Sequence, residues 1–142
     1  MSLHQLIYVS TLTAAARAEL PGILDKSVAN NQAQGLTGML LYADGNVIQV
    51  LEGEKAALDA AFQRIERDPR HYGIIVLLNK AIDARQFDAW SMGYRSVSAA
   101  ELQAFPLAEQ VFKSKDAEIE RRVQPGAALH VLKTFMENTG RG

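Results

Sequence analysis

Cysteine is absent from the 142-residue sequence, and no strong excess of charge of either sign is present. The lack of thiols excludes disulfides, thiol nucleophiles and thiolate metal sites. Because 15 Lys and Arg residues are set against 16 Asp and Glu residues, the formal net charge is only −1. We therefore expect neither nucleic acid nor an anionic membrane as a partner.

Long apolar runs and targeting segments are also missing. No apolar stretch approaches the roughly 20 residues of a membrane-spanning helix, and the amino terminus lacks the basic region and apolar core of a signal peptide. The three histidines are scattered without carboxylates at metal-ligand spacing, and no dinucleotide, phosphate-loop or Gly-x-Ser-x-Gly motif occurs. The sequence predicts a cytoplasmic protein without a metal site.

What is present is the composition of an ordinary globular domain, 48% hydrophobic and 22% charged, at a length that suits one domain. Apolar patterning predicts five strands, at residues 6–10, 36–42, 46–53, 73–82 and, more weakly, 87–95. The Asp44-Gly45 pair predicts a hairpin turn between the second and third strands. The fourth run is apolar throughout, so we expect it to be covered on both faces.

Two helices are expected between these strands. Propensity alone would begin the first helix at Thr13, but Pro21 would then lie in its interior. We therefore expect the helix to begin between Arg17 and Leu20, with the proline in its first turn. The second helix is predicted over residues 54–68, where apolar side chains recur at helical spacing and an Asp-Pro pair ends the pattern.

The resulting order, β-α-β-β-α-β-β, predicts an α+β fold with a ferredoxin-like mixed sheet and both helices on one face. Two further helices are expected in the tail, at residues 100–105 and 127–138, and would cover the other face. We accordingly treat residues 1–96 as the core and residues 97–142 as a helical extension of the same domain.

Gln49 interrupts the otherwise apolar third strand at its centre. A buried amide needs hydrogen-bond partners, and leaving one buried polar group unpaired costs about 1–3 kcal/mol. A glutamine in this position either pairs with a neighbouring backbone group or hydroxyl for structural reasons, or serves a ligand.

Other polar side chains also lie where apolar ones are expected. Ser27 and Asn31 continue the apolar stripe of the first helix, although Asn31 could instead cap its end, and Tyr8 lies inside the first strand as a possible core tyrosine. If Tyr8, Asn31 and Gln49 converge between sheet and helix, they form a polar trio in an apolar cleft. Such a cleft suits a flat heteroaromatic ligand.

Two further clusters have both a functional and a plain interpretation. Arg67, Arg70 and His71 surround the end of the second helix, where they could hold a phosphate or form a solvated turn. Trp90 and Met92 share one face of the fifth strand, a pattern that more often reflects packing than a cofactor site.

In this order and spacing, several segments resemble the BLUF domain, a flavin-binding sensor of blue light. The resemblance extends from about Leu3 to Tyr94 and is carried by "LIYVS", "NNQAQGLTGMLLY", "GNVIQVLEG", "RIERDPRHYG" and "FDAWSMGY". It implies that Tyr8 is the photoactive tyrosine, that Gln49 is the essential glutamine, and that Asn31 holds the polar edge of the flavin.

The resemblance also assigns residues at the periphery of the site. Trp90 and Met92 match a pair on the family's fifth strand, and Arg70 and His71 match positions near the ribityl phosphate. Asp68 is a further candidate beside them. Ser27 is inferred from the helix stripe rather than from the resemblance.

The implied cofactor is FAD, with FMN or riboflavin also accepted. The implied mechanism transfers an electron and then a proton from Tyr8 to the excited flavin and leaves the Gln49 amide rearranged, by rotation or tautomerisation. No substrate is turned over. We expect a short, stand-alone photoreceptor that signals through a homo-oligomer or a separate effector protein.

Two alternatives from other functional classes remain at this point. One is a ferredoxin-like acylphosphatase that uses Asn31 and Arg70, although no Gly-rich phosphate-binding loop follows the first strand. The other is a regulatory module that binds a small effector in the same cleft.

Overall fold

A computed structural model describes residues 2–43, 45–87 and 93–96 of the protein. In this part of the chain the elements are, in order, β1 (Leu3–Leu12), α1 (Ala14–Ala18), α2 (Leu20–Gln34), β2 (Thr37–Ala43), β3 (Asn46–Glu54), α3 (Lys55–Arg67), β4 (His71–Ala81) and β5 (Gly93–Ser96). The predicted tail helices and the boundary after residue 96 lie outside the described residues and stay predictions.

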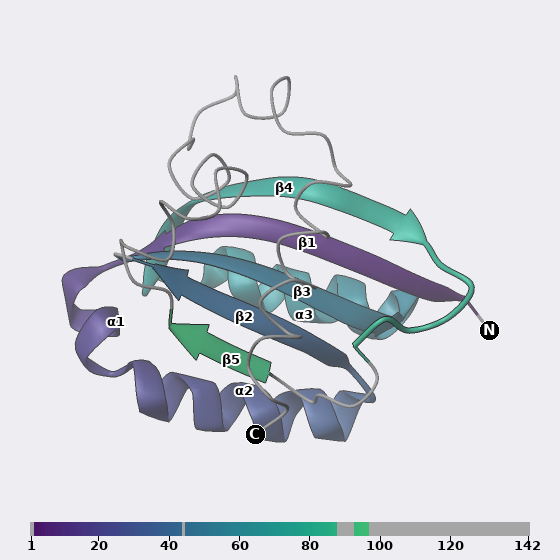
Figure 1. Ribbon diagram of the computed structural model, residues 1–142, viewed down its shortest axis with the longest axis horizontal. Coiled ribbons are helices and arrows are strands. Elements are labelled where there is room, and N and C mark those ends of the chain that lie inside the picture. The colour runs from purple at the N-terminus through teal and green to yellow at the C-terminus, as the bar shows by residue number, and fades with distance from the viewer. Residues whose placement is uncertain (1, 44, 88–92, 97–142) are drawn as a thin grey trace.

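The strands form one mixed sheet in the order β4-β1-β3-β2-β5 (Figure 1). β1 pairs antiparallel with both β3 and β4, β2 pairs antiparallel with β3, and β5 joins β2 in parallel. Side chains of α2 and α3 line one cleft together with side chains of β1 and β3, so both helices lie on the same face. The predicted ferredoxin-like α+β arrangement is confirmed.

The predicted first helix is confirmed as α2, which begins at Leu20 with Pro21 in its first turn, but a separate short helix that was not predicted, α1, precedes it. α1 is capped by Thr13, whose Oγ1 accepts a hydrogen bond from the backbone N–H of Ala16 at 3.2 Å. The helical geometry breaks at Glu19, and α2 begins again with Pro21 in its first turn. The break satisfies both sequence signals, since a first-turn proline sacrifices no helical hydrogen bond.

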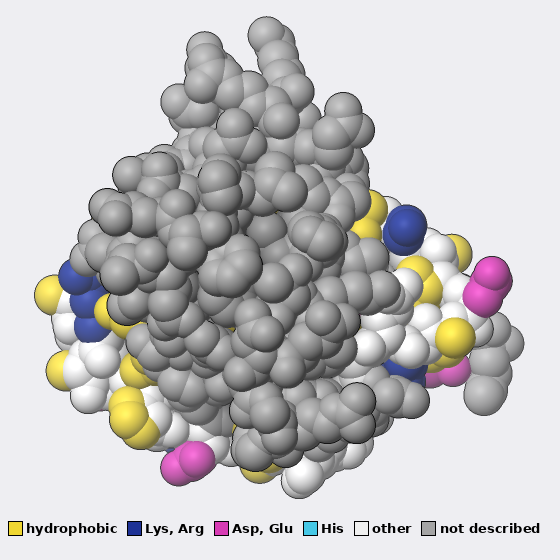
Figure 2. All heavy atoms as spheres, viewed as in Figure 1, with side chains coloured by type: hydrophobic (Ala, Val, Ile, Leu, Met, Phe, Trp, Pro, Cys, Tyr) yellow, Lys and Arg dark blue, Asp and Glu magenta, His cyan; other side chains and the backbone are white. Residues whose placement is uncertain are grey.

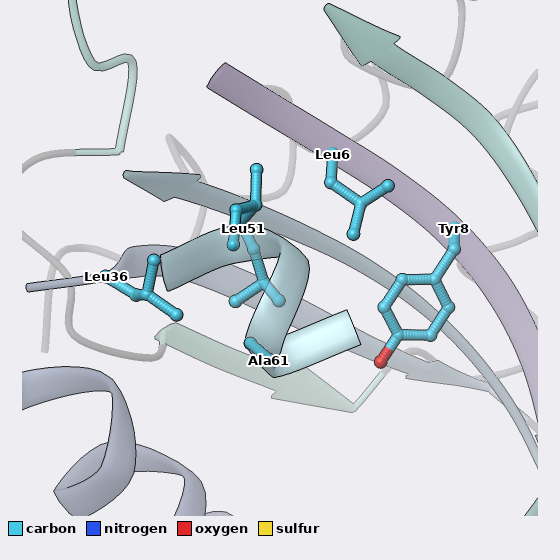
Figure 3. Close-up of a cluster of buried hydrophobic side chains, with 6 residues drawn as sticks. Leu6, Tyr8, Leu36, Leu51 and Ala61 are labelled. Atoms are coloured by element: carbon cyan, nitrogen blue, oxygen red, sulfur yellow. The ribbon is translucent and has the colours of Figure 1, made fainter. Parts of the chain in front are cut away.

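The apolar face of α3 packs as its spacing predicted. Leu58 and Ala61 of this helix are buried against Leu6, Leu36 and other sheet-face residues, in the cluster shown in Figure 3. The helix ends at Arg67, directly before the Asp-Pro pair. Tyr8 is a member of the same cluster, so the core that anchors α3 also holds the first of the proposed functional residues.

The expectation that the fourth strand is covered on both faces stays a prediction, because the tail helices expected to cover the second face lie outside the described residues. β4 forms one edge of the sheet beside β1, and its residues range from half-buried to exposed (Figure 1). A continuous apolar run does not distinguish a central strand from an edge strand, because both need apolar contacts with a neighbouring layer.

The surface of the described residues reflects the balanced composition. In the view of Figure 2, Lys and Arg side chains and Asp and Glu side chains both appear on the two visible flanks. Within the described ranges, no helix is long and apolar enough to cross a membrane.

Substitution of Gly38 in β2 tests its close approach to β3, and substitution of Gly22 in α2 serves as the comparison. A Cβ at Gly38 would lie 2.0 Å from the carbonyl oxygen of Val50, whereas a Cβ at Gly22 in α2 would meet nothing within 4 Å. Gly38→Ala should lower the free energy of unfolding by about 1–3 kcal/mol. Gly22→Ala should raise it by up to about 1 kcal/mol, because alanine favours a helix over glycine.

Urea denaturation of both variants and the native chain measures these changes. A Gly38→Ala variant as stable as the native chain would contradict the close approach of β2 to β3.

Candidate functional site

A cleft of about 460 Å³ opens between the helix-bearing face of the sheet and the two longer helices. Its volume lies within the roughly 300–1,000 Å³ typical of small-molecule sites. Much of its wall is apolar and comes from all of these elements: Leu12, Leu20, Ile23, Leu40, Val47, Leu51, Ala61 and Ile65. The polar side chains discussed next enter this apolar setting.

Tyr8 and Gln49 form a hydrogen-bonded pair across two strands. The antiparallel register of β1 and β3 makes them direct partners, so both side chains point to the helix-bearing face. The Tyr8 hydroxyl donates to Gln49 Oε1, and the two residues are only 4% and 6% exposed. Gln49 therefore pairs with a neighbouring hydroxyl, which a purely structural role would also require. That hydroxyl, however, is the Tyr8 phenol of the predicted trio, and both side chains line the cleft.

Asn31 completes the trio from α2. Its residue is buried and lines the cleft. The helix ends instead at Gly35, which adopts a left-handed φ of 70°, and the backbone N–H of Leu36 donates to the Asn31 carbonyl at 2.8 Å. The alternative that Asn31 caps the helix is therefore wrong. Ser27, one turn earlier, is half-buried and also lines the cleft.

Asp68 and Arg70 form a close ion pair at the wall of the cleft. Arg70 Nη2 donates to Asp68 Oδ2 at 2.6 Å, and Nε donates to both carboxylate oxygens at 2.9 and 3.0 Å. These hydrogen bonds hold the pKa of the Asp68 carboxyl below its usual value and raise the pKa of the Arg70 guanidinium. The pairing fixes the orientation of Arg70 and partly neutralises its charge.

His71 ties three elements together beside the cleft. Its Nε2 donates to the Ile65 carbonyl of α3 at 2.6 Å, since a carbonyl only accepts, and its Nδ1 lies 3.0 Å from Ser10 Oγ of β1. Its ring centroid is 6.5 Å from that of Tyr8. Both ring nitrogens are thus engaged within the protein, and the role of His71 near a phosphate stays a prediction.

Sequence reasoning missed Arg64 as a lining residue. Arg64 and Arg67 are one turn apart at the end of α3, and with Arg70 they are three arginines that line the cleft. The i, i+3 spacing of the first two was the available signal.

Trp90 and Met92 lie outside the described residues, so their positions stay predictions. No group of three metal-ligating side chains occurs among the residues described.

The cleft alters the acidity of the Tyr8 phenol. Burial raises the pKa of the phenol well above its ordinary value of 10.0, and the Asp68 carboxylate raises it further. The phenol therefore keeps its proton, and in this structure it donates that proton to Gln49 Oε1.

Comparison with known families and relatives gives one consistent result. The family model described as "Sensors of blue-light using FAD" (BLUF) matches residues 3–93. The photoactivated adenylate cyclase subunit beta of Euglena longa is 31% identical over 112 residues, which are 78% of this chain and 13% of that protein. The blue light- and temperature-regulated antirepressor BluF of Escherichia coli (strain K12) is 38% identical over 63 residues, 43% of this chain and 16% of the relative.

Solved structures agree with these sequence relatives. The dark-state structure of BlrB, a BLUF protein, is 35% identical with a TM-score of 0.68, and the match covers 89% of this chain and 96% of that one. The photo-activated state of BlsA is 27% identical with a TM-score of 0.70, over 89% of this chain and 94% of its own. The chain thus matches these two structures over nearly their whole length but spans only a small part of the curated relatives.

The buried phenol yields a prediction about its titration. Tyr8 should remain protonated at pH 10 in the folded protein, because burial opposes the charged form. Asp68→Asn should lower its pKa, since a nearby negative charge is removed, but not to the ordinary value, because burial is the larger cause. NMR titration of isotope-labelled tyrosine ring carbons, with Tyr8→Phe to assign the signal, measures both. A Tyr8 signal that titrates at or below pH 10 would refute the burial argument.

Proposed function

The chain belongs to the BLUF family of blue-light sensors that use FAD, and from that premise we propose that Tyr8, Gln49 and Asn31 are its photochemical centre. The observation that carries the proposal is the hydrogen bond from the buried Tyr8 hydroxyl to Gln49 inside the cleft. A redox-active phenol, a reorientable amide and a second amide are the groups that such photochemistry requires.

The residues of the cleft fit a flavin. A flat ring system with a polar edge requires apolar walls and a few convergent hydrogen-bonding groups, and the cleft supplies both. Asn31, Gln49 and Ser27 would hold the polar edge. Arg64, Arg67 and Arg70 are suited to the phosphate of FAD or FMN, because guanidinium groups match phosphate oxygens in geometry and charge.

When bound, the flavin supplies the absorption of blue light and accepts the electron and proton. Tyr8 is the proposed donor of both, and its raised pKa keeps the proton on its hydroxyl oxygen until light acts. Burial between the sheet and the helices excludes competing water from the phenol, and the cross-strand hydrogen bond holds the proton toward Gln49.

Gln49 is the proposed movable part of the site. Its amide has two chemically different ends, a carbonyl oxygen that accepts and an NH₂ group that donates. With Oε1 directed to Tyr8 in the structure, a rotation or tautomerisation of the amide would change which group faces the phenol and which faces the flavin. The backbone of β3, paired on both sides, would hold its position while the side chain changes.

Signalling without catalysis is the second element of the proposal. A bacterial light-regulated adenylyl cyclase structure matches 75% of this chain with only 31% of its own, at 32% identity, so the shared part is a fraction of a protein named for its cyclase. We infer that this chain is the sensor, turns over no substrate, and passes its signal to a homo-oligomer or a separate effector. The acylphosphatase alternative is disfavoured because the family model that matches residues 3–93 describes blue-light sensors.

The main test is the difference between dark and illuminated absorption spectra of the purified protein with FAD. The native chain should show a reversible red shift in blue light. Gln49→Leu should retain the flavin but lose the shift, because leucine has no amide to rearrange. Gln63→Leu, at an exposed position of α3, is the matched control and should respond as the native chain does.

Two results would count against the assignment. Absence of any red shift in the flavin-loaded native chain would reject the photosensor function. A normal shift in Gln49→Leu would reject the role of Gln49 alone.

Asn31→Ala tests the second amide. Loss of one hydrogen bond worth about 0.5–1.5 kcal/mol should weaken flavin binding by about 2- to 10-fold. Gln32→Ala, at the exposed next position of the same helix, should leave the affinity unchanged. Titration of each apoprotein with FAD, followed by fluorescence, gives the dissociation constants. Equal affinities for Asn31→Ala and the native chain would remove Asn31 from the site.

A further inference from the structure

Arg85, in the connection after β4, contacts two other segments of the chain at once. Its Nη2 donates to the Gly35 carbonyl at 2.8 Å, and its Nη1 donates to Thr37 Oγ1 at 2.9 Å and to the Glu52 carbonyl at 3.0 Å. The first two acceptors lie where α2 ends and β2 begins, and the third lies in β3. One guanidinium group therefore links the end of α2 to the end of β3.

The side chain of Glu52 binds the backbone of the same connection after β4, at the two residues that follow Arg85. The residue is fully buried, and by strand alternation its side chain points to the sheet face opposite Gln49. Its Oε1 accepts from the backbone N–H groups of Phe87 and Gln86 at 2.8 and 2.9 Å, and its Oε2 accepts from Gln5 Nε2 at 2.8 Å. A buried carboxylate with this many donors fixes the backbone directly after Arg85, because moving it would leave the charge unpaired.

These contacts lie close in the chain to both amides of the proposed site. Gly35 follows Asn31 by four residues, and the backbone of Asn31 is hydrogen-bonded to that of Leu36. Glu52 follows Gln49 by three residues on the same strand. Leu36 is buried and packs in the cluster that contains Tyr8 (Figure 3). A shift of the α2 end against the β3 end would therefore alter the distance between the two amides.

We propose that Arg85 is a positioning residue of the photosensor site, which holds the Asn31 helix and the Gln49 strand at a fixed separation. The inference rests on the proposed function and adds a residue outside the cleft. Arginine suits this role because its planar fork presents several donors in fixed directions, whereas a lysine ammonium cannot reproduce the same set. The arrangement sets how readily the Gln49 amide returns to its dark orientation.

The test compares Arg85→Lys with Arg17→Lys, the same substitution at an exposed arginine of α1. The flavin-loaded full chain is illuminated, and the rate of return to the dark spectrum is followed by absorption. Arg85→Lys should change this rate by about threefold or more, which corresponds to about 0.7 kcal/mol in the barrier. It should also move the dark absorption maximum, whereas Arg17→Lys should do neither.

A purely structural role is separated by a stability control. Thr13→Ala removes the cap of α1 and should lower stability by about 1 kcal/mol without altering the spectra or the rate of return. Thr37→Val removes one acceptor of Arg85 while keeping the shape of the side chain, so it should change the rate in the same direction by a smaller factor. If Arg85→Lys fails to fold, Thr37→Val replaces it as the test variant.

The outcomes are distinct. A native chain that binds FAD but shows no red shift would reject the proposed function and this inference with it. If the native chain shows a normal red shift but Arg85→Lys leaves the rate and the spectra unchanged, the positioning role is overturned and the proposed function stays intact. The same result in Thr37→Val has the same meaning when Arg85→Lys does not fold. A change in Thr13→Ala equal to that in Arg85→Lys would show that lost stability, and not position, controls the rate.

Discussion

The antiparallel register between β1 and β3 is the constraint on which the site depends. It places Tyr8 opposite Gln49 and turns both toward the helices. Because side chains alternate along a strand, a slip of one residue would put Tyr8 and Gln49 on opposite faces of the sheet. The buried apolar residues beside them on β1 and β3 prevent such a slip, since they would lose their packing. The core that stabilises the fold thus also holds the phenol against the amide.

Each face of the central strands carries one buried polar arrangement. On the helix face, Tyr8 and Gln49 meet within the cleft, and on the other face Gln5 and Glu52 meet beside the connection that follows β4. Most buried polar groups in folded proteins have a hydrogen-bond partner, as the Tyr8 hydroxyl and Gln5 Nε2 do here. The two arrangements share β1 and β3, the route by which the proposed positioning by Arg85 would reach the cleft. Arg85 extends this route to the end of α2.

Prediction from sequence succeeded where periodicity or local turn chemistry carried the information. The stripe on α3 and the hairpin between β2 and β3 follow from local patterns, and the α+β order follows from the succession of such patterns along the chain. It placed the start of α2 correctly but missed the short helix α1, because Thr13 and Pro21 were treated as competing signals for one helix, whereas a helix break satisfies both. The place of β4 at the sheet edge was not predicted, since it depends on which strands pair.

By itself, the sequence determined which residue types were available and on which face of its own element each would lie. It also marked Tyr8, Gln49 and Asn31 as polar exceptions in apolar surroundings. Only the tertiary structure decided that Tyr8 donates to Gln49, that Asp68 engages Arg70, and that Arg85 joins two distant segments. The reason is physical: alternation and helical period are properties of a single segment, whereas hydrogen bonds between segments depend on register and packing across the whole sheet.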